Sequence, residues 1–209
     1  MSETCPCNDA ELLSRVEGVE ALPQLLGALA SRKPVDLNEF VDVARPAGAD
    51  LARVIRAQPG TEWDSEGRLV GFGITTRPTA YRFVVGDKIL YTWCAHDTLL
   101  FTVVLGKATV AESTCPETGQ TIRIEMNPEG IVSVSPPQAV VSQRHLDDLV
   151  DNLRAEICDH GHFFASPSAA EEWLAEHPDG AVVSVKDAFA ECRAACEQLG
   201  WTHSEVSSR

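Results

Sequence analysis

The spacing of apolar residues changes at Arg77-Pro78, and this change constrains the fold more than any other feature of the chain. Before it, apolar side chains recur at helical spacing, as in Leu22, Leu25 and Leu29. After it, short runs rich in β-branched and aromatic residues are separated by turns. The sequence therefore predicts an α+β fold, in which a helical N-terminal part precedes a mixed part of strands and helices.

Residues 9–77 are predicted to form an N-terminal domain, preceded by a disordered tail over residues 1–8. Its predicted elements are two helices within 9–31, a helix over 36–43, a helix after residue 48 and a hairpin over 62–74. Gly18 and Pro23 separate the first two helices, because both residues interrupt a helical pattern. Helices followed by a hairpin give the outline of a winged helix.

Residues 78–209 are predicted to form a second domain, which carries the candidate site. The predicted strands are 81–85, 88–91, 108–115, 121–126, 131–134 and 182–185, and the predicted helices are 97–101, 145–157, 166–174 and 187–199. Turns rich in Gly, Pro, Asn and Asp separate the strands.

The charge of the chain excludes several classes of partner. It has 31 acidic and 17 basic residues, a net charge of −14, whereas binding to nucleic acid or anionic membranes needs clustered Lys and Arg. Between residues 32 and 68 the basic side chains are offset by seven acidic ones, which are Asp36, Glu39, Asp42, Asp50, Glu62, Asp64 and Glu66. We therefore expect neither nucleic acid nor a membrane as a partner.

Nothing in the sequence directs the chain to a membrane or to export. No apolar run approaches the ~20 residues that cross a bilayer. The acidic N-terminus is not followed by the apolar core of a signal peptide. We therefore expect a cytoplasmic protein.

The seven cysteines differ in their settings. They are Cys5, Cys7, Cys94, Cys115, Cys158, Cys192 and Cys196. An odd count without a CxxC pair indicates free thiols rather than a disulfide framework or a zinc ribbon. Three of them, Cys115, Cys192 and Cys196, are predicted to be core residues. Cys5 and Cys7 lie in the predicted tail and are assigned no role.

Cys94 and Cys158 have neighbours that a core position does not need. Asp97 follows Cys94 by three residues, which places the two on one face of a helix. The alternative is that Asp97 only caps the turn. Cys158 is followed by Asp159, His160 and His162, and the two histidines could instead belong to a zinc site.

Five stretches together resemble the bacterial organomercurial lyases, also called alkylmercury lyases. They occur in the family's order and at about its spacings, and they are Arg32–Val35, Glu66–Gly73, Leu90–Leu99, Cys158–Ser166 and Val183–Val185. The resemblance implies a winged-helix-like N-terminal part and a mixed α/β catalytic part with antiparallel sheet. It also implies two catalytic cysteines and one aspartate, which correspond to Cys94, Cys158 and Asp97. The tail with Cys5 and Cys7 matches no motif of the family.

The resemblance implies cleavage of the carbon–mercury bond of an organomercury substrate to a hydrocarbon and Hg(II). Mercury would bind to Cys94 and Cys158, with Asp97 beside it, and no cofactor is expected. Hg(II) would leave to small thiols or to mercuric reductase. The competing hypothesis is a non-catalytic protein that binds or senses mercury or a transition metal. Asp97 distinguishes the two, because a carrier does not need a proton donor beside its thiols.

Overall fold

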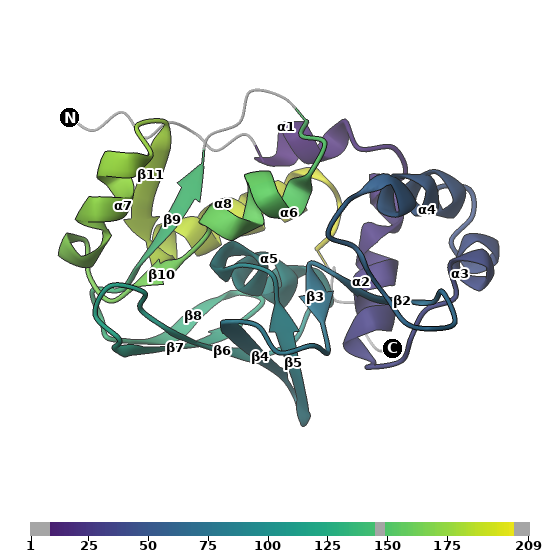
Figure 1. Cartoon of the computed structure of the whole chain (residues 1–209). Helices are drawn as coiled ribbons and strands as arrows, with labels where there is room; N and C mark the ends of the chain where they lie inside the picture. The colour runs from purple at the N-terminus through teal and green to yellow at the C-terminus, as the bar shows by residue number, and fades with distance from the viewer. Residues whose placement is uncertain (1–8, 145–148, 203–209) are drawn as a thin grey trace.

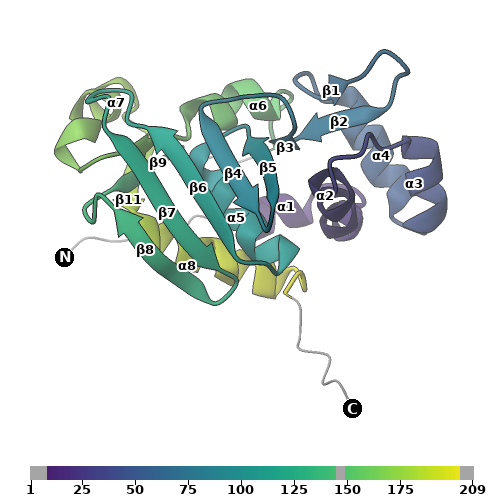
Figure 2. The same ribbon diagram turned by 90° about the horizontal axis from the view of Figure 1, so that it is seen from below.

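A computed structural model describes residues 9–144 and 149–202, and most of its strands belong to one sheet (Figures 1 and 2). The order in this sheet is β1-β2-β3-β5-β4-β6-β7-β8, and all neighbouring strands are antiparallel. The bounds are β1 Glu62–Trp63, β2 Leu69–Phe72, β3 Ile74–Thr75, β4 Tyr81–Val85, β5 Lys88–Thr92, β6 Thr109–Thr114, β7 Thr121–Asn127 and β8 Gly130–Ser135.

A second sheet has three antiparallel strands in the order β10-β9-β11. They are β9 Val140–Arg144, β10 Phe163–Phe164 and β11 Gly180–Ser184. β9 and β10 were not predicted from the sequence. Val140, Val141 and Ser142 are all buried, so the central strand lacks the alternation of buried and exposed residues that marks a half-buried strand.

The helices surround and separate the two sheets. They are α1 Asp9–Ser14, η1 Val19–Ala21, α2 Leu22–Ala30, α3 Leu37–Val43, α4 Gly48–Ala57, α5 Ala95–Leu105, α6 Leu153–Glu156, η2 Cys158–His160, η3 Ser168–Ala170, α7 Glu171–Glu176 and α8 Val185–Gln198. α5 and α8 pack against each other, and each contacts strands of both sheets. α2 packs against α5 and β3, which joins the N-terminal helices to this layer (Figure 1).

α5 is longer than the helix predicted over residues 97–101. It runs from Ala95 to Leu105 and ends at Gly106, which adopts the left-handed conformation with φ 60°. Seven of its eleven residues are buried, so α5 lacks the polar face that would have indicated its full length in the sequence.

The helix predicted over residues 145–157 is much shorter in the structure. Residues 145–148 lie outside the described residues, and α6 covers only Leu153–Glu156. Asn152 begins it, because its side chain accepts a hydrogen bond from the Ala155 N–H at 3.2 Å. The prediction followed apolar spacing alone and missed this cap.

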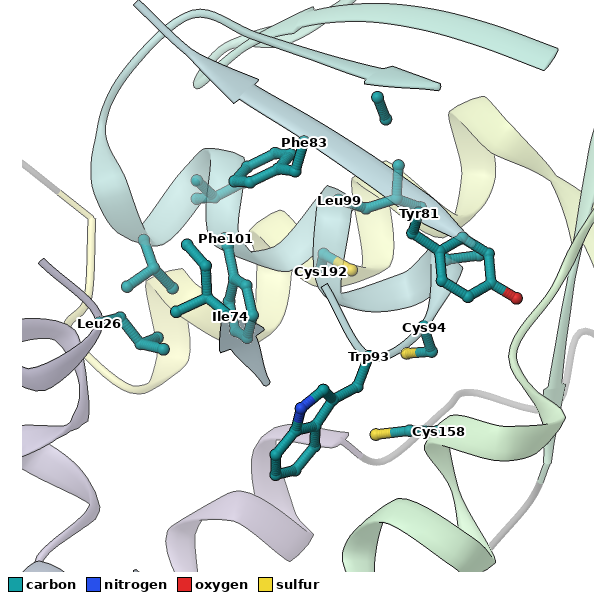
Figure 3. Packing of buried hydrophobic residues seen from close by; sticks show 14 of the residues in the cluster. Leu26, Ile74, Tyr81, Phe83, Trp93, Cys94, Leu99, Phe101, Cys158 and Cys192 are labelled. Carbon is teal, nitrogen blue, oxygen red and sulfur yellow. The ribbon is translucent and has the colours of Figure 1, made fainter. Parts of the chain in front are cut away.

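The buried side chains from both halves of the chain form one cluster, which extends in sequence from Val19 to Trp201. Figure 3 shows Leu26 from α2 beside Ile74 from β3 and Phe101 from α5. The hairpin predicted over residues 62–74 is present as β1 and β2, and it continues through β3 into the eight-stranded sheet. The division of the chain after residue 77 stays a prediction.

Among residues 9–144 and 149–202, no helix combines the length and the apolar character that a membrane span requires.

Candidate active site

Cys94 and Asp97 meet at the start of α5, where they cap the helix together. The Asp97 N–H donates to the Cys94 sulfur at 3.4 Å, and the Cys94 N–H donates to Asp97 Oδ2 at 3.1 Å. This reciprocal arrangement is a capping box with a thiol in the place usually taken by a hydroxyl. Capping, which was the alternative role for Asp97, is therefore present, and the same geometry holds its carboxylate beside the thiol.

Cys158 reaches the same place from the loop after α6. It begins η2, and Gly161 follows this turn. The Ala95 N–H donates to the Gly161 carbonyl at 3.0 Å, which joins the two segments. A Cβ at Gly161 would lie 3.1 Å from Cys94 Cβ and 3.4 Å from its sulfur, so glycine allows this close approach.

The structure thus brings together all three residues that the sequence predicted. One ligand atom from each of Cys94, Asp97 and Cys158 lies within 4.8 Å of the others, and this is the only such group of His, Cys, Asp and Glu within the described residues. The thiols are nearly closed off, at 2% and 4% exposure, whereas Asp97 is partly exposed. Figure 3 shows both cysteines beside the ring of Trp93.

The environment of the site favours uncharged thiols. The hydrogen bond between Cys94 and Cys158, burial and the negative charge of Asp97 raise the pKa of the Cys94 thiol. The same hydrogen bond lowers the pKa of Cys158, but burial and the charges of Asp97 and Asp159 outweigh it, so the pKa of Cys158 is also raised. Both thiols are therefore protonated at neutral pH.

The Asp97 carboxyl is packed among protein atoms although the residue as a whole is partly exposed, so burial acts on this group as well. It raises the pKa of Asp97 from 3.8 to about 6, against the opposing effect of the hydrogen bonds from Cys94. The group is thus ionised at pH 7 but can be protonated at a modest cost. The two soft sulfur ligands can bind a soft metal ion, and the carboxyl beside them can transfer a proton at the same place.

The two histidines after Cys158 take part in separate contacts. His160 Nδ1 lies 3.0 Å from His177 Nε2, and His162 Nδ1 lies 2.7 Å from the Tyr81 hydroxyl. Neither belongs to the group of potential ligands around Cys94 in the described part of the chain. The structure therefore gives no support to the zinc site that their spacing suggested.

The other cysteines agree with the sequence where the structure describes them. Cys115, Cys192 and Cys196 are 0%, 1% and 0% exposed, as predicted for core residues. Cys192 has one contact that was not predicted, because its sulfur lies 3.2 Å from His96 Nε2. Cys5 and Cys7 lie outside the described residues.

Sequence reasoning missed a buried carboxylate next to the site. Glu62 was counted only as one of the charges that offset the basic residues of the N-terminal part, yet it is 7% exposed and accepts a hydrogen bond from the Trp93 indole N–H at 3.0 Å. Its neighbour Arg154 also escaped notice. Nothing in the local sequence distinguishes either from a surface charge, since the contact between them joins segments 92 residues apart.

Comparisons with known proteins agree with the geometry. A sequence model of the alkylmercury lyase family matches residues 74–197. The chain is similar to an alkylmercury lyase of Bacillus cereus, with 42% identity over 165 residues, which are 79% of this chain and 75% of the relative. A relative of the same description from Streptomyces lividans is 38% identical over 175 residues, which are 84% of this chain and 81% of the relative.

A solved structure extends the likeness to the fold. The crystal structure of the mercury-bound form of MerB2 superimposes with a TM-score of 0.75 and 21% identity, over 94% of this chain and 100% of that one. The predicted α+β class with an antiparallel sheet is thereby confirmed.

Proposed function

This chain belongs to the alkylmercury lyase family, and we propose that it cleaves the carbon–mercury bond of organomercury cations, RHg⁺, by protonolysis. The observation that carries the proposal is the group of Cys94, Cys158 and Asp97, whose ligand atoms lie within 4.8 Å of one another. Soft mercury prefers thiolate ligands, and a carboxyl beside them can protonate the carbon.

Asp97 acts first as a base and then as an acid. Ionised at pH 7, it takes the proton of Cys94 as that sulfur binds mercury. Cys158 binds next as a thiolate, releases its proton to solvent and increases the electron density on the attached carbon. Asp97 then protonates that carbon, and the carbon–mercury bond breaks with its electron pair on carbon. The balance is RHg⁺ plus two thiols giving RH, Hg(II) bound by two thiolates, and H⁺.

The raised pKa values of the thiols agree with this order of events. Because the hydrogen bond with Cys158, burial and the charge of Asp97 raise the pKa of Cys94, its thiolate forms only when a metal replaces the proton. A nearby base is then needed to remove the proton, and the capping box keeps an Asp97 carboxylate oxygen within 4.8 Å of the Cys94 sulfur. A protein that only carries mercury has no use for this returning proton.

Hg(II) held by Cys94 and Cys158 must then leave the protein. We propose that small thiols or mercuric reductase accept it, since exchange between thiolates moves mercury without any resident cofactor. The reaction itself then needs no bound metal or organic cofactor.

The N-terminal part is proposed to be a winged-helix-like cover of the catalytic part rather than a DNA-binding domain. α2 packs against α5 and β3, which supports the covering role. Three of its basic side chains lie in ion pairs: Arg45 with Asp42, Arg53 with Glu17 and Asp50, and Arg68 with Asp64 and Glu66. Such pairing, together with the acidic residues that offset the other basic ones, disfavours binding to phosphates.

The direct test is turnover of phenylmercury by the purified chain in the presence of excess small thiol. We expect benzene release in proportion to the phenylmercury consumed, measured by gas chromatography. Tight binding of phenylmercury without benzene would instead identify a mercury-binding protein.

A further inference from the structure

Glu62 is a carboxylate that is buried without being part of the thiol site. Its Oε2 accepts a hydrogen bond from the Thr75 hydroxyl at 2.8 Å, and its Oε1 accepts from Trp93 Nε1 at 3.0 Å and from Arg154 Nη1 at 3.3 Å. The Arg77 Nε lies 3.6 Å from Oε2. Burying a carboxylate is unfavourable unless it is paired and hydrogen-bonded, so this many partners at one buried group invites a functional explanation.

The partners of Glu62 Oε1 are neighbours of the two thiols. Trp93 directly precedes Cys94, and Arg154 precedes Cys158 by four residues on α6. The Arg154 guanidinium also lies over the Trp93 ring, 5.1 Å from its centroid. One carboxylate oxygen therefore connects the segments that supply both sulfurs, and the cation–π contact closes a triangle between them.

The segment of Cys158 depends on such polar contacts. α6 has four residues, none of them fully buried, and of its apolar residues only Leu153 packs against the buried cluster, so polar contacts contribute much to fixing its place. Its first residue, Leu153, donates its N–H to Gln58 Oε1 at 3.0 Å. A Cβ at Gly60 would lie 2.9 Å from Arg154 Cβ. α6 therefore packs against the segment from Gln58 to Glu62.

The sheet makes room for this carboxylate. Gly71 lies opposite Glu62 in the β1–β2 pair, and a Cβ at Gly71 would lie 2.9 Å from Glu62 Cδ and Oε2. Only a residue without a side chain lets the carboxylate lie against the strand in this way.

We propose that Glu62 and Arg154 are positioning residues, which hold Cys94 and Cys158 at the separation at which both sulfurs bind one mercury atom. This inference rests on the proposed function for its effect on turnover, but its effect on Hg(II) binding is independent of catalysis. Second-layer groups that orient metal ligands typically change metal affinity or activity by about 10- to 100-fold when they are removed.

The test uses the full chain with Cys5→Ser and Cys7→Ser, so that tail thiols do not compete for metal. In this background, Glu62→Gln and Arg154→Gln are compared with Glu112→Gln. Glu112 is the control, because it also pairs with two arginines, Arg82 and Arg123, but these pairs join β6 to β4 and β7, strands that do not carry Cys94 or Cys158. One equivalent of Hg(II) is added against dithiothreitol as competitor, and phenylmercury turnover is measured separately.

We expect Glu62→Gln and Arg154→Gln each to lower Hg(II) affinity and kcat by about 10- to 100-fold, with KM changed much less. Glu112→Gln should match the parent chain in both. The double variant should lose less than the sum of the two single losses, since the two residues belong to one network around Trp93.

Two results would overturn the inference: parental Hg(II) affinity in both variants, or an equal loss in Glu112→Gln. If Glu62→Gln does not fold, Arg154→Gln decides alone, because Glu62 then keeps its ion pair with Arg77 and its hydrogen bonds from Thr75 and Trp93. A parent chain that binds Hg(II) but releases no benzene would contradict the proposed function, while the affinity comparison would still test the positioning role.

Discussion

The Asp97 carboxylate and the Cys94 thiol each accept a hydrogen bond from the other residue's backbone N–H, at 3.1 Å and 3.4 Å. Helix capping and the proposed proton transfer thus involve the same two side chains, and a substitution can separate them. Asp97→Asn keeps an oxygen that accepts the Cys94 N–H but cannot transfer a proton. We expect this variant to bind Hg(II) and to release little or no benzene from phenylmercury. Benzene at the wild-type rate would remove the proton-donor role.

Cys94→Ser and Cys158→Ser should each lower turnover by orders of magnitude, because two thiolates must bind one mercury atom and a hydroxyl is a poor ligand for a soft metal. Cys196→Ala is the control, since that thiol is fully buried away from the site and its loss should cost only ~1–2 kcal/mol of stability. Phenylmercury kinetics and thermal unfolding would be measured on all three. Near-normal kcat in either serine variant would contradict the two-thiolate mechanism.

Gly161→Ala should impair turnover without unfolding the chain. The added methyl would lie 3.1 Å from Cys94 Cβ, so the loop carrying Cys158 must move away by a fraction of an ångström. Misplacement of a reacting group by about 1 Å can cost ~100-fold in rate. Gly27→Ala is the matched control, because nothing lies within 4 Å of its new methyl and α2 should gain up to about 1 kcal/mol. Equal kcat values for the two variants would show that the close approach does not matter.

The pH dependence of stability should identify Asp97 as an unfavourably buried acid. Burial raises its folded pKa to about 6 from 3.8, so the folded state binds a proton more readily than the unfolded state between these pH values. Ionisation of Asp97 therefore destabilises the fold above pH 6, and Asp97→Asn should be more stable than wild type at pH 8. The difference should shrink as the pH falls from 6 towards 4. Urea unfolding at several pH values would measure it, and a difference that grew on acidification would contradict the assignment.

His160→Ala should leave phenylmercury turnover largely unchanged, and so should dialysis against EDTA. His160 is hydrogen-bonded to His177 and lies outside the group formed by Cys94, Asp97 and Cys158. A zinc enzyme would lose its activity in both experiments. Loss of turnover on dialysis, restored by added zinc, would reverse this conclusion.

The sequence indicated which residues meet at the candidate site better than it indicated the connections around them. Cys94, Asp97 and Cys158 were singled out because their neighbours form a motif, and the structure brings the three together, whereas their catalytic role stays a prediction. Glu62 was not, because its burial is created by contacts with Thr75, Trp93 and Arg154, which no local pattern records.

The fold shows the same division. The strands from Tyr81 to Ser135 were predicted within a few residues, because exposed and buried positions alternate along most of them. β9 was missed, because consecutive residues from Val140 are buried and leave no alternation to read. The helix predicted over 145–157 was placed too early within the described residues. α6 begins only after Asn152, whose side chain accepts a hydrogen bond from the Ala155 N–H, and the apolar spacing did not indicate this start.

The buried cluster that extends from Val19 to Trp201 includes Cys94 and Cys158, so the proposed metal-binding atoms are part of the packed interior. Because this cluster includes residues from the N-terminal helices and from both sheets, we expect these parts to unfold together in one cooperative step. A soft metal ion that binds to the two sulfurs only in the folded state then stabilises the whole fold, because binding shifts the folding equilibrium by mass action. The melting temperature should therefore rise with the fraction of protein that has metal bound, even when unfolding is followed by a probe in the N-terminal helices.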